Sequence, residues 1–332
     1  MVLCEGQGLE VQIFKQPIKM IRNTNVDVTI NSLPFAKHVL QEVRPINVVS
    51  LFNGMGTLRQ AFHNLGIKVN NYYSSEIKTY AIKLQQHHFP DVIQVGDIRN
   101  WREWDIDWSS IDFIGSGSPC QDLSSSGKRG GINADNSGLF WIFIEILEHC
   151  KKLNPNVKFL QENVGSARKK DIGIMSRALG LYPSRIDSSL ITAQLRDRYY
   201  WTNIRTKESM FDIVSDIPQP KDKGIKLQDI LTDGFTKREK SKTLLERRSF
   251  CYIDEFSDNA QRFLKTREKF GVIVINLDNG ILRTVNKVEM CRLQGFPDDY
   301  CDILNEDKAQ SLLGDGWTLP MIEHILSFYA VP

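Results

Sequence analysis

From Ile46 onward, short apolar segments alternate with helix-like segments, and this alternation constrains the fold more than any other feature of the sequence. Residues 46–52 form an apolar, β-branched run, a glycine-containing turn follows, and residues 57–65 have a helical pattern. The pattern continues with predicted strands at 69–75, 92–95, 111–115 and 157–160 and with predicted helices after Lys78 and over 139–150. Such alternation favours a mostly parallel sheet covered on both faces, which binds its ligands at the carboxyl ends of the strands.

The same pattern suggests how the chain is divided. Residues 1–44 carry no readable motif and are an N-terminal extension of unknown role, whereas residues 45–205 carry the alternating pattern. Two prolines and a lysine-rich stretch then indicate a linker and a smaller module over 206–282. Regular character returns over 283–332, which ends in a helix-like stretch from Leu319 to Tyr329.

Composition excludes several classes of protein. Of the 332 residues, 41% are hydrophobic and 25% are charged, which argues against a disordered chain, a collagen or a simple coiled coil. No run approaches the ~20 apolar residues of a membrane span, and residues 1–15 have no apolar signal core. Six cysteines without a C-x-x-C pair predict reduced thiols in an intracellular protein. The net charge is only +2, but basic residues cluster over 236–249 and 165–177, where they could contact phosphates or face solvent.

Three features at successive strand ends point to a nucleoside-containing ligand. Gly54 and Gly56 allow close approach to the backbone, but Arg59 stands where a dinucleotide fingerprint needs its third glycine, which argues against NAD. Glu76 follows Gly56 by 20 residues, where an acid binds ribose hydroxyls. Asp97 follows the third strand and could accept a hydrogen bond from an adenine amino group. Together they fit S-adenosylmethionine, which needs no phosphate site.

Three further motifs could carry chemistry. Pro119 fixes its own φ and restrains the preceding residue, so that the thiol of Cys120 leaves the strand end in a defined direction. Glu162 follows the strand at 157–160, and Arg196 and Arg198 lie farther along the chain. A lone cysteine is usually a buried apolar residue. A thiol, a carboxyl and a guanidinium at the strand ends of one sheet instead predict an active site.

The order of these motifs resembles the cytosine-5 DNA methyltransferases from about Ile46 to the C-terminus. The resemblance rests on Pro119-Cys120-Gln121, Glu162-Asn163-Val164, Gln194-Leu195-Arg196-Asp197-Arg198 and Arg292-Leu293-Gln294-Gly295-Phe296-Pro297. Residues 169–172 and 314–320 are more similar to the vertebrate de novo branch, whereas 124–128 are more similar to bacterial and phage enzymes. Two positions depart from the family, since Asn53 replaces its usual acid and Asp315 its usual Asn or Arg.

The resemblance implies a covalent mechanism. Carbon 5 of cytosine is a weak nucleophile until a thiolate adds at carbon 6, and Cys120 would be that thiolate. Glu162 would supply a proton or a hydrogen bond to ring nitrogen 3, Arg198 would bind the 2-oxo group, and Arg196 would position the loop. The target base must leave the duplex, with the glycine-rich loop at 124–138 closing over it.

The resemblance also implies the fold and the binding residues. It implies a seven-stranded, mostly parallel Rossmann-like sheet with one antiparallel strand, a small target-recognition module at about 206–282 and a C-terminal segment that returns to the catalytic domain. The residues expected to bind S-adenosylmethionine are Phe52, Asn53, Gly54, Gly56, Thr57, Glu76, Ile77, Asp97, Ile98 and Trp317. Those expected to bind double-stranded DNA are Ser126, Lys128, Arg129, Lys240, Lys242, Arg247 and Arg248. No metal and no membrane partner are expected.

Three alternatives remain beside a DNA cytosine-5 methyltransferase. The tRNA-methylating branch of the family carries a Cys-Phe-Thr signature that this sequence lacks. A catalytically inactive member acting as a binding or regulatory partner would be expected to have lost Cys120, Glu162 or Arg198, and all three are present. A dinucleotide oxidoreductase is disfavoured by Arg59. Without recognisable reader domains, the chain fits a prokaryotic or phage enzyme, either solitary or part of a restriction-modification system, although a catalytic fragment of a larger protein would look the same.

Overall fold

The computed structural model describes residues 44–119, 138–210, 212–245 and 283–329, together with the backbone of 252–254, 274–276 and 281–282. Residues 43–332 form one compact unit. The predicted extension at 1–44, apart from its last residue, lies outside the described residues. So do six of the predicted site residues, namely Cys120, Ser126, Lys128, Arg129, Arg247 and Arg248.

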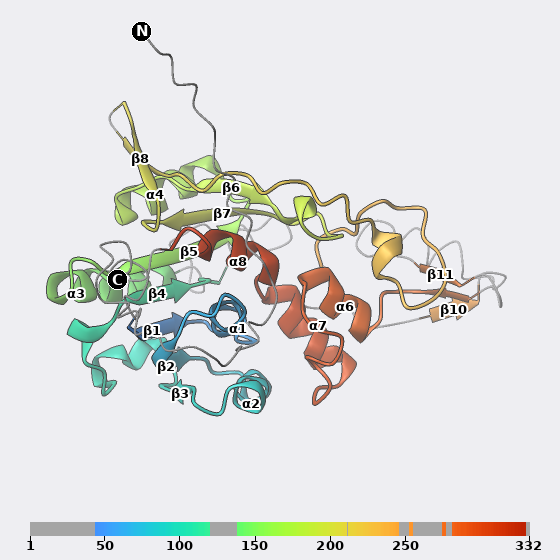
Figure 1. Cartoon of the computed structure of the whole chain (residues 1–332), viewed down its shortest axis with the longest axis horizontal. Coiled ribbons are helices and arrows are strands. Elements are labelled where there is room, and N and C mark those ends of the chain that lie inside the picture. Colours follow the sequence, from blue (N-terminus) through green and yellow to red (C-terminus); the bar gives the residue numbers. More distant parts are fainter. Residues whose placement is uncertain are drawn as a thin grey trace, which may run out of the picture. The chain divides into compact units, whose positions relative to one another are not determined.

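A seven-stranded sheet forms the centre of this unit, in the order β3-β2-β1-β4-β5-β7-β6 (Figure 1). Its strands are β1 (Ile46–Leu51), β2 (Val69–Ser75), β3 (Ile93–Gln94), β4 (Phe113–Ser116), β5 (Lys158–Val164), β6 (Ser184–Asp187) and β7 (Asp197–Thr202). The pairs from β3 to β5 are parallel, and β7 is antiparallel to both β5 and β6. The predicted mostly parallel sheet with one antiparallel strand is therefore confirmed.

Helices cover both faces of the sheet because its strands bury alternate residues on opposite sides. The helices are α1 (Thr57–Asn64), α2 (Thr79–His88), α3 (Leu139–Leu153), α4 (Lys169–Leu179), α6 (Lys287–Gln294), α7 (Glu306–Asp315) and α8 (Leu319–Leu326). In β4, Phe113 belongs to the core that includes α1, α6, α7 and α8, whereas Ile114 belongs to the core that includes α3 and α4. The predicted C-terminal helix is α8, and it contacts α1 (Figure 1).

The segment predicted as a recognition module begins beside the large sheet. Its first part is a hairpin of β8 (Thr206–Ser209) and β9 (Asp212–Ser215), which bridges to Tyr182 just before β6. A short 3₁₀ helix, η6 (Leu227–Ile230), then places Leu227 and Ile230 in the core shared by α6–α8. A small antiparallel sheet of β10 (Tyr252–Asp254), β12 (Ile281–Arg283) and β11 (Val274–Asn276) follows in that spatial order.

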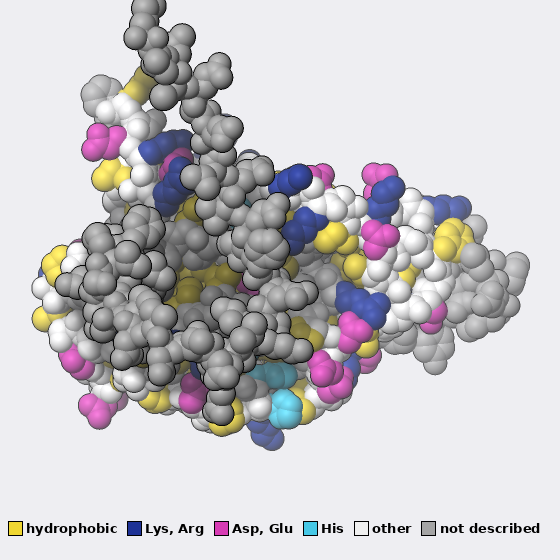
Figure 2. All heavy atoms as spheres, in the orientation of Figure 1, with side chains coloured by type: hydrophobic (Ala, Val, Ile, Leu, Met, Phe, Trp, Pro, Cys, Tyr) yellow, Lys and Arg dark blue, Asp and Glu magenta, His cyan; other side chains and the backbone are white. Residues whose placement is uncertain are grey.

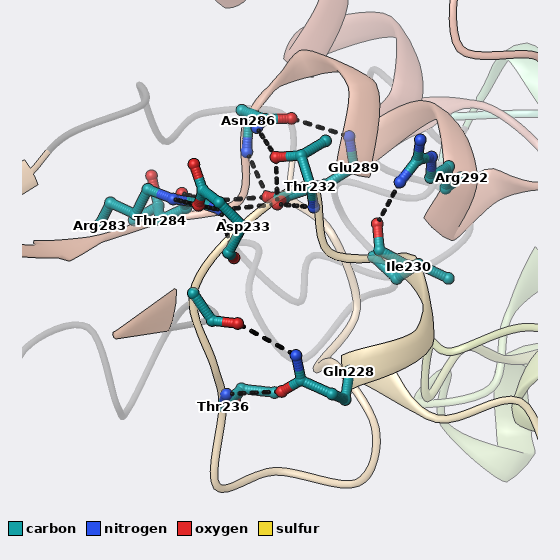
Figure 3. A network of polar contacts seen from close by, with 11 residues as sticks. Gln228, Ile230, Thr232, Asp233, Thr236, Arg283, Thr284, Asn286, Glu289 and Arg292 are labelled. Atoms are coloured by element: carbon teal, nitrogen blue, oxygen red, sulfur yellow. Dashed lines mark hydrogen bonds and ion pairs between the residues drawn. The ribbon is translucent and has the colours of Figure 1, made fainter. Parts of the chain in front are cut away.

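A buried polar network joins this segment to α6 (Figure 3). Arg283, at the end of β12, donates from Nη1 and Nη2 to the two carboxylate oxygens of Glu289 at 2.8 and 2.7 Å. Glu289 is fully buried and also accepts from the backbone N–H and the hydroxyl of Thr232. Asn286 caps α6 and exchanges hydrogen bonds with Glu289. Because a buried carboxylate must be paired, this network fixes the chain around Thr232 against α6.

No described helix is long and apolar enough to cross a membrane. No group of three or more His, Cys, Asp or Glu side chains in the described ranges is arranged to hold a metal ion.

Candidate active site

A cavity of about 360 Å³ lies at the carboxyl ends of β1, β2, β4 and β5, within the usual size range of small-molecule sites. Nine of the ten residues predicted to bind the methyl donor line it, namely Phe52, Asn53, Gly54, Thr57, Glu76, Ile77, Asp97, Ile98 and Trp317. The tenth, Gly56, does not line it but caps α1 with a φ of 84°. Glu162, Arg196 and Arg198 line the same cavity, so the structure brings the two predicted sites together.

The turn after β1 forms one wall of the cavity and depends on left-handed backbone. Phe52, Gly54 and Gly56 all have positive φ, which explains the glycines because other residues rarely adopt that conformation. Beneath the turn, the amide oxygen of Asn53 accepts from Ser50 Oγ and Tyr72 Oη, at 2.7 and 2.9 Å. Its amide nitrogen donates to Ser74 Oγ at 3.0 Å. A carboxylate could only accept, so Asn53 suits this buried position better than the usual acid.

Glu76 and Asp97 are held by backbone groups at the next two strand ends. Glu76 accepts from the N–H groups of Gly54, Ile77 and Lys78 at 2.8–2.9 Å. Asp97 accepts from the N–H of Arg99, as an N-terminal cap, and also pairs with its guanidinium. Both carboxylates are therefore oriented in advance and retain acceptor capacity toward the cavity.

The end of the cavity that holds the predicted catalytic residues is built on β5. Glu162 is nearly buried. Its Oε1 forms an ion pair with Arg198 Nε at 2.8 Å, and its Oε2 accepts from Trp317 Nε1 at 3.0 Å. The pairing of β5 with β7 brings Glu162 and Arg198 together, since Val164 is the direct partner of Arg198. Cys120 follows Pro119, which lines the cavity.

Sequence reasoning missed the residues that fix the turn before Cys120. Gln161 and Asn163 lie on the opposite face of β5 from Glu162 and both donate to Ser118 Oγ, at 2.9 and 3.3 Å. Asn163 Oδ1 also accepts from the N–H of Val164, at 2.8 Å. The alternation of Gln161 and Asn163 around Glu162 is a signal that could have identified this brace.

Arg196 acts on a different part of the cavity wall. It is buried, and its Nη2 donates to the carbonyl oxygens of Gly314 at 3.0 Å and Gly316 at 2.7 Å. Through these contacts Arg196 holds the turn between α7 and α8, which carries Trp317. Its expected role in positioning a catalytic loop stays a prediction.

The two described lysines of the predicted DNA interface have different surroundings. Lys240 Nζ donates to the backbone carbonyls of Ser189 at 2.7 Å, Thr192 at 3.0 Å and Ile225. An ammonium group has three N–H donors, so this geometry contradicts a phosphate contact by Lys240. Lys242 is partly exposed. In Figure 2, basic side chains lie interspersed with acidic ones over this part of the surface.

The strand order and the cavity define a class of protein, the Rossmann-like methyltransferases that use S-adenosylmethionine. Comparison with known proteins gives the family. Residues 46–179 match the family model described as C-5 cytosine-specific DNA methylase. The type II methyltransferase M1.ScrFI of Lactococcus lactis subsp. cremoris is 27% identical over 84% of this chain and 76% of its own. Over residues 46–179 the chain thus matches the cytosine-5 DNA methyltransferase family, which its motifs resemble.

Two further comparisons agree with this assignment. The orphan methyltransferase M.SPRI of Bacillus phage SPR is 30% identical over 48% of this chain and 38% of its own. The solved structure of the Entamoeba histolytica methyltransferase EhMeth superposes with a TM-score of 0.59 at 16% identity, over 86% of this chain and 98% of that one. The first supports the expected similarity to phage enzymes, and the second supports the fold.

The residues around the cavity fit S-adenosylmethionine, the methyl donor of this family. The donor combines an aromatic base, a ribose and a positively charged sulfonium. Phe52 and Ile98 give the cavity apolar surface, and Glu76 and Asp97 give it acceptors for hydroxyl and amino groups. The donor has no phosphate, so the site needs no basic side chain to bind one. The chemistry of the lining therefore matches the donor.

Proposed function

We propose that this enzyme methylates carbon 5 of a cytosine flipped out of duplex DNA, through a covalent adduct with Cys120. The observation that carries the proposal is the Glu162–Arg198 pair, which lies at the cavity wall together with the Pro119 that precedes Cys120. A carboxyl and a guanidinium side by side are complementary to the N3 and 2-oxo edge of cytosine.

In the proposed reaction the Cys120 thiolate forms a bond to carbon 6, and the electron pair of the 5,6 double bond becomes available at carbon 5. Glu162 donates a proton or a hydrogen bond to N3, where negative charge would otherwise develop. Arg198 forms an ion pair with Glu162 through Nε and donates a hydrogen bond from Nη1 to the carbonyl of Asp197. Its Nη2 makes no hydrogen bond to any described residue, and we assign it to the 2-oxo oxygen.

Glu76, Asp97 and Phe52 would hold S-adenosylmethionine in the cavity. When bound, the donor would supply an electrophilic methyl group for carbon 5 and would leave as the neutral thioether S-adenosylhomocysteine. The reaction closes when a base removes the proton from carbon 5 and the bond between Cys120 Sγ and carbon 6 breaks, which restores the aromatic ring and the thiolate. Action inside a prokaryotic or phage-infected cell belongs to the same proposal, because M1.ScrFI comes from a bacterium and M.SPRI from a phage.

A duplex that contains 5-fluorocytosine tests this proposal, because fluorine at carbon 5 cannot leave in the last step. Wild-type enzyme with S-adenosylmethionine should form a covalent complex that survives denaturing electrophoresis, and Cys120→Ser should form none. Cys150→Ser is the matched control, since Cys150 is buried in α3 away from the cavity. A Cys120→Ser variant that still traps the duplex, or labelled methyl groups that enter tRNA but not DNA, would contradict the proposal. An inactive binding partner would trap nothing.

A further inference from the structure

The two oxygens of the Glu162 carboxylate are held by residues from two different elements of the fold. Arg198 on β7 holds Oε1, and the indole N–H of Trp317, 155 residues along the chain, holds Oε2 at 3.0 Å. Trp317 lies in the turn between α7 and α8 and also lines the cavity. One indole therefore contacts the catalytic carboxyl and forms part of the wall against which the methyl donor would bind.

The indole lies directly against the backbone of the turn that leads to Cys120. A Cβ atom placed on Gly117 would be 2.8 Å from Trp317 Nε1 and 3.2 Å from its Cε2. A Cβ atom on Gly115 would be 3.6 Å from Trp317 Cη2. Gly117 has no positive φ, so it is needed for space rather than for conformation. The glycine thus lets the indole approach closely enough to reach Glu162.

The turn that carries Trp317 is itself fixed from the sheet. Arg196 donates to the carbonyls of Gly314 and Gly316, and Gln294 accepts from the Thr318 hydroxyl at 2.8 Å. Arg196 and Arg198 are two residues apart, just before and within β7. Arg198 therefore holds Glu162 directly, and Arg196 holds the turn whose tryptophan reaches Glu162 from the other side.

We propose that Trp317 is a positioning residue for Glu162, which links the wall of the cofactor cavity to the carboxyl that acts on the cytosine ring. The proposal rests on the proposed function, because it assumes that Glu162 serves the base. A positioning role differs from a role in donor binding alone. If Trp317 positions Glu162, loss of the indole N–H should slow methyl transfer more than it weakens donor binding.

The first test separates these roles kinetically. Trp317→Phe keeps an aromatic ring but removes the N–H, and should lower the single-turnover rate of methyl transfer at least about tenfold, while the Kd for S-adenosylmethionine changes less than about threefold. Trp104→Phe is the matched control, because Trp104 does not line the cavity. The inference is overturned if Trp317→Phe weakens donor binding about tenfold and leaves the saturated rate unchanged.

A double-mutant cycle tests the contact with the glycine. Gly117→Ala should push the indole away from Glu162 and slow methyl transfer in the wild-type background. In the Trp317→Phe background the same change should cost much less, because the hydrogen bond is already absent. Rate losses that simply multiply would overturn the proposed path from Gly117 through Trp317 to Glu162.

The NMR signal of the Trp317 indole N–H tests the contact with Glu162 without requiring an active enzyme, so the inference can fail or hold independently of the proposed function. The chain has six tryptophans, and the Trp317 indole N–H resonance can be assigned as the one missing from the Trp317→Phe spectrum. Glu162→Gln replaces a charged acceptor by a neutral one and should shift that resonance more than any of the other five. An unshifted Trp317 resonance overturns the inference, whereas an inactive wild type that still shows the shift overturns the proposed function alone.

Discussion

Replacing Arg283 by methionine should lower the free energy of unfolding by about 3 kcal/mol. The guanidinium donates two hydrogen bonds to Glu289, whose side chain is 0% exposed, so the substitution leaves a buried carboxylate without its counter-ion. Breaking a buried pair in this way costs about 3–5 kcal/mol. We expect the lower end of that range, because Glu289 keeps its hydrogen bonds from Thr232 and Asn286.

The assay is urea unfolding followed by circular dichroism, with linear extrapolation to water. Arg102→Met is the matched control, because Arg102 and its partner Glu145 have side chains 66% and 52% exposed. Exposed pairs contribute about 0–1 kcal/mol. Adding Glu289→Gln to Arg283→Met should recover part of the loss, since no unpaired charge then remains buried. If Arg283→Met costs no more than Arg102→Met, the reasoning about this network is refuted.

Three further predictions concern the cavity, the thiols and the basic segment. Lys78 and Asp315 join two walls of the cavity through an ion pair at 2.9 Å, so Asp315→Asn should speed dissociation of S-adenosylmethionine a few-fold in stopped-flow fluorescence, less so at high salt. Burial raises the pKa of the Cys150 thiol to about 12, so at pH 8 it stays protonated and iodoacetamide should spare it in the native protein, as peptide mapping would show, whereas labelling as fast as in the unfolded chain would contradict this. Lys240→Ala leaves three carbonyls without their donor and should lower the free energy of unfolding in urea by about 1–3 kcal/mol. A loss below roughly 0.5 kcal/mol, which is the spread of surface substitutions, would contradict this structural role.

Much of the site could be predicted because parallel strands end at one edge of a sheet. Glu76, Asp97 and Glu162 each follow a strand that the pattern identified, and all three line one cavity. The position of Arg198 could not come from periodicity. It depends on β7 running antiparallel beside β5, and strand pairing between distant segments leaves no local signal in the sequence.

The contacts that the sequence did not show are those made by side chains whose partners converge only in the folded chain. Lys240 stands in a run of basic residues, which is typical of a solvated surface or of a phosphate contact. Its ammonium instead binds carbonyls from two separate segments, at 189–192 and at 225. Trp317 was expected at the cofactor cavity, but its hydrogen bond to Glu162 depends on the close approach of two turns.

The internal role of Lys240 changes what the basic segment can contribute to DNA binding. If Lys240 and Lys242 both contacted phosphates, neutralising them together would flatten the dependence of log K on log salt by roughly two units, because each contact contributes about 0.9. With all three N–H donors of Lys240 used by carbonyls, only Lys242 can act, and the expected change falls to about one unit. The loss of stability in the double variant should match that of Lys240→Ala alone. A salt titration that still shows two units would mean that Lys240 leaves its carbonyl partners when DNA binds, and that the segment rearranges in the complex.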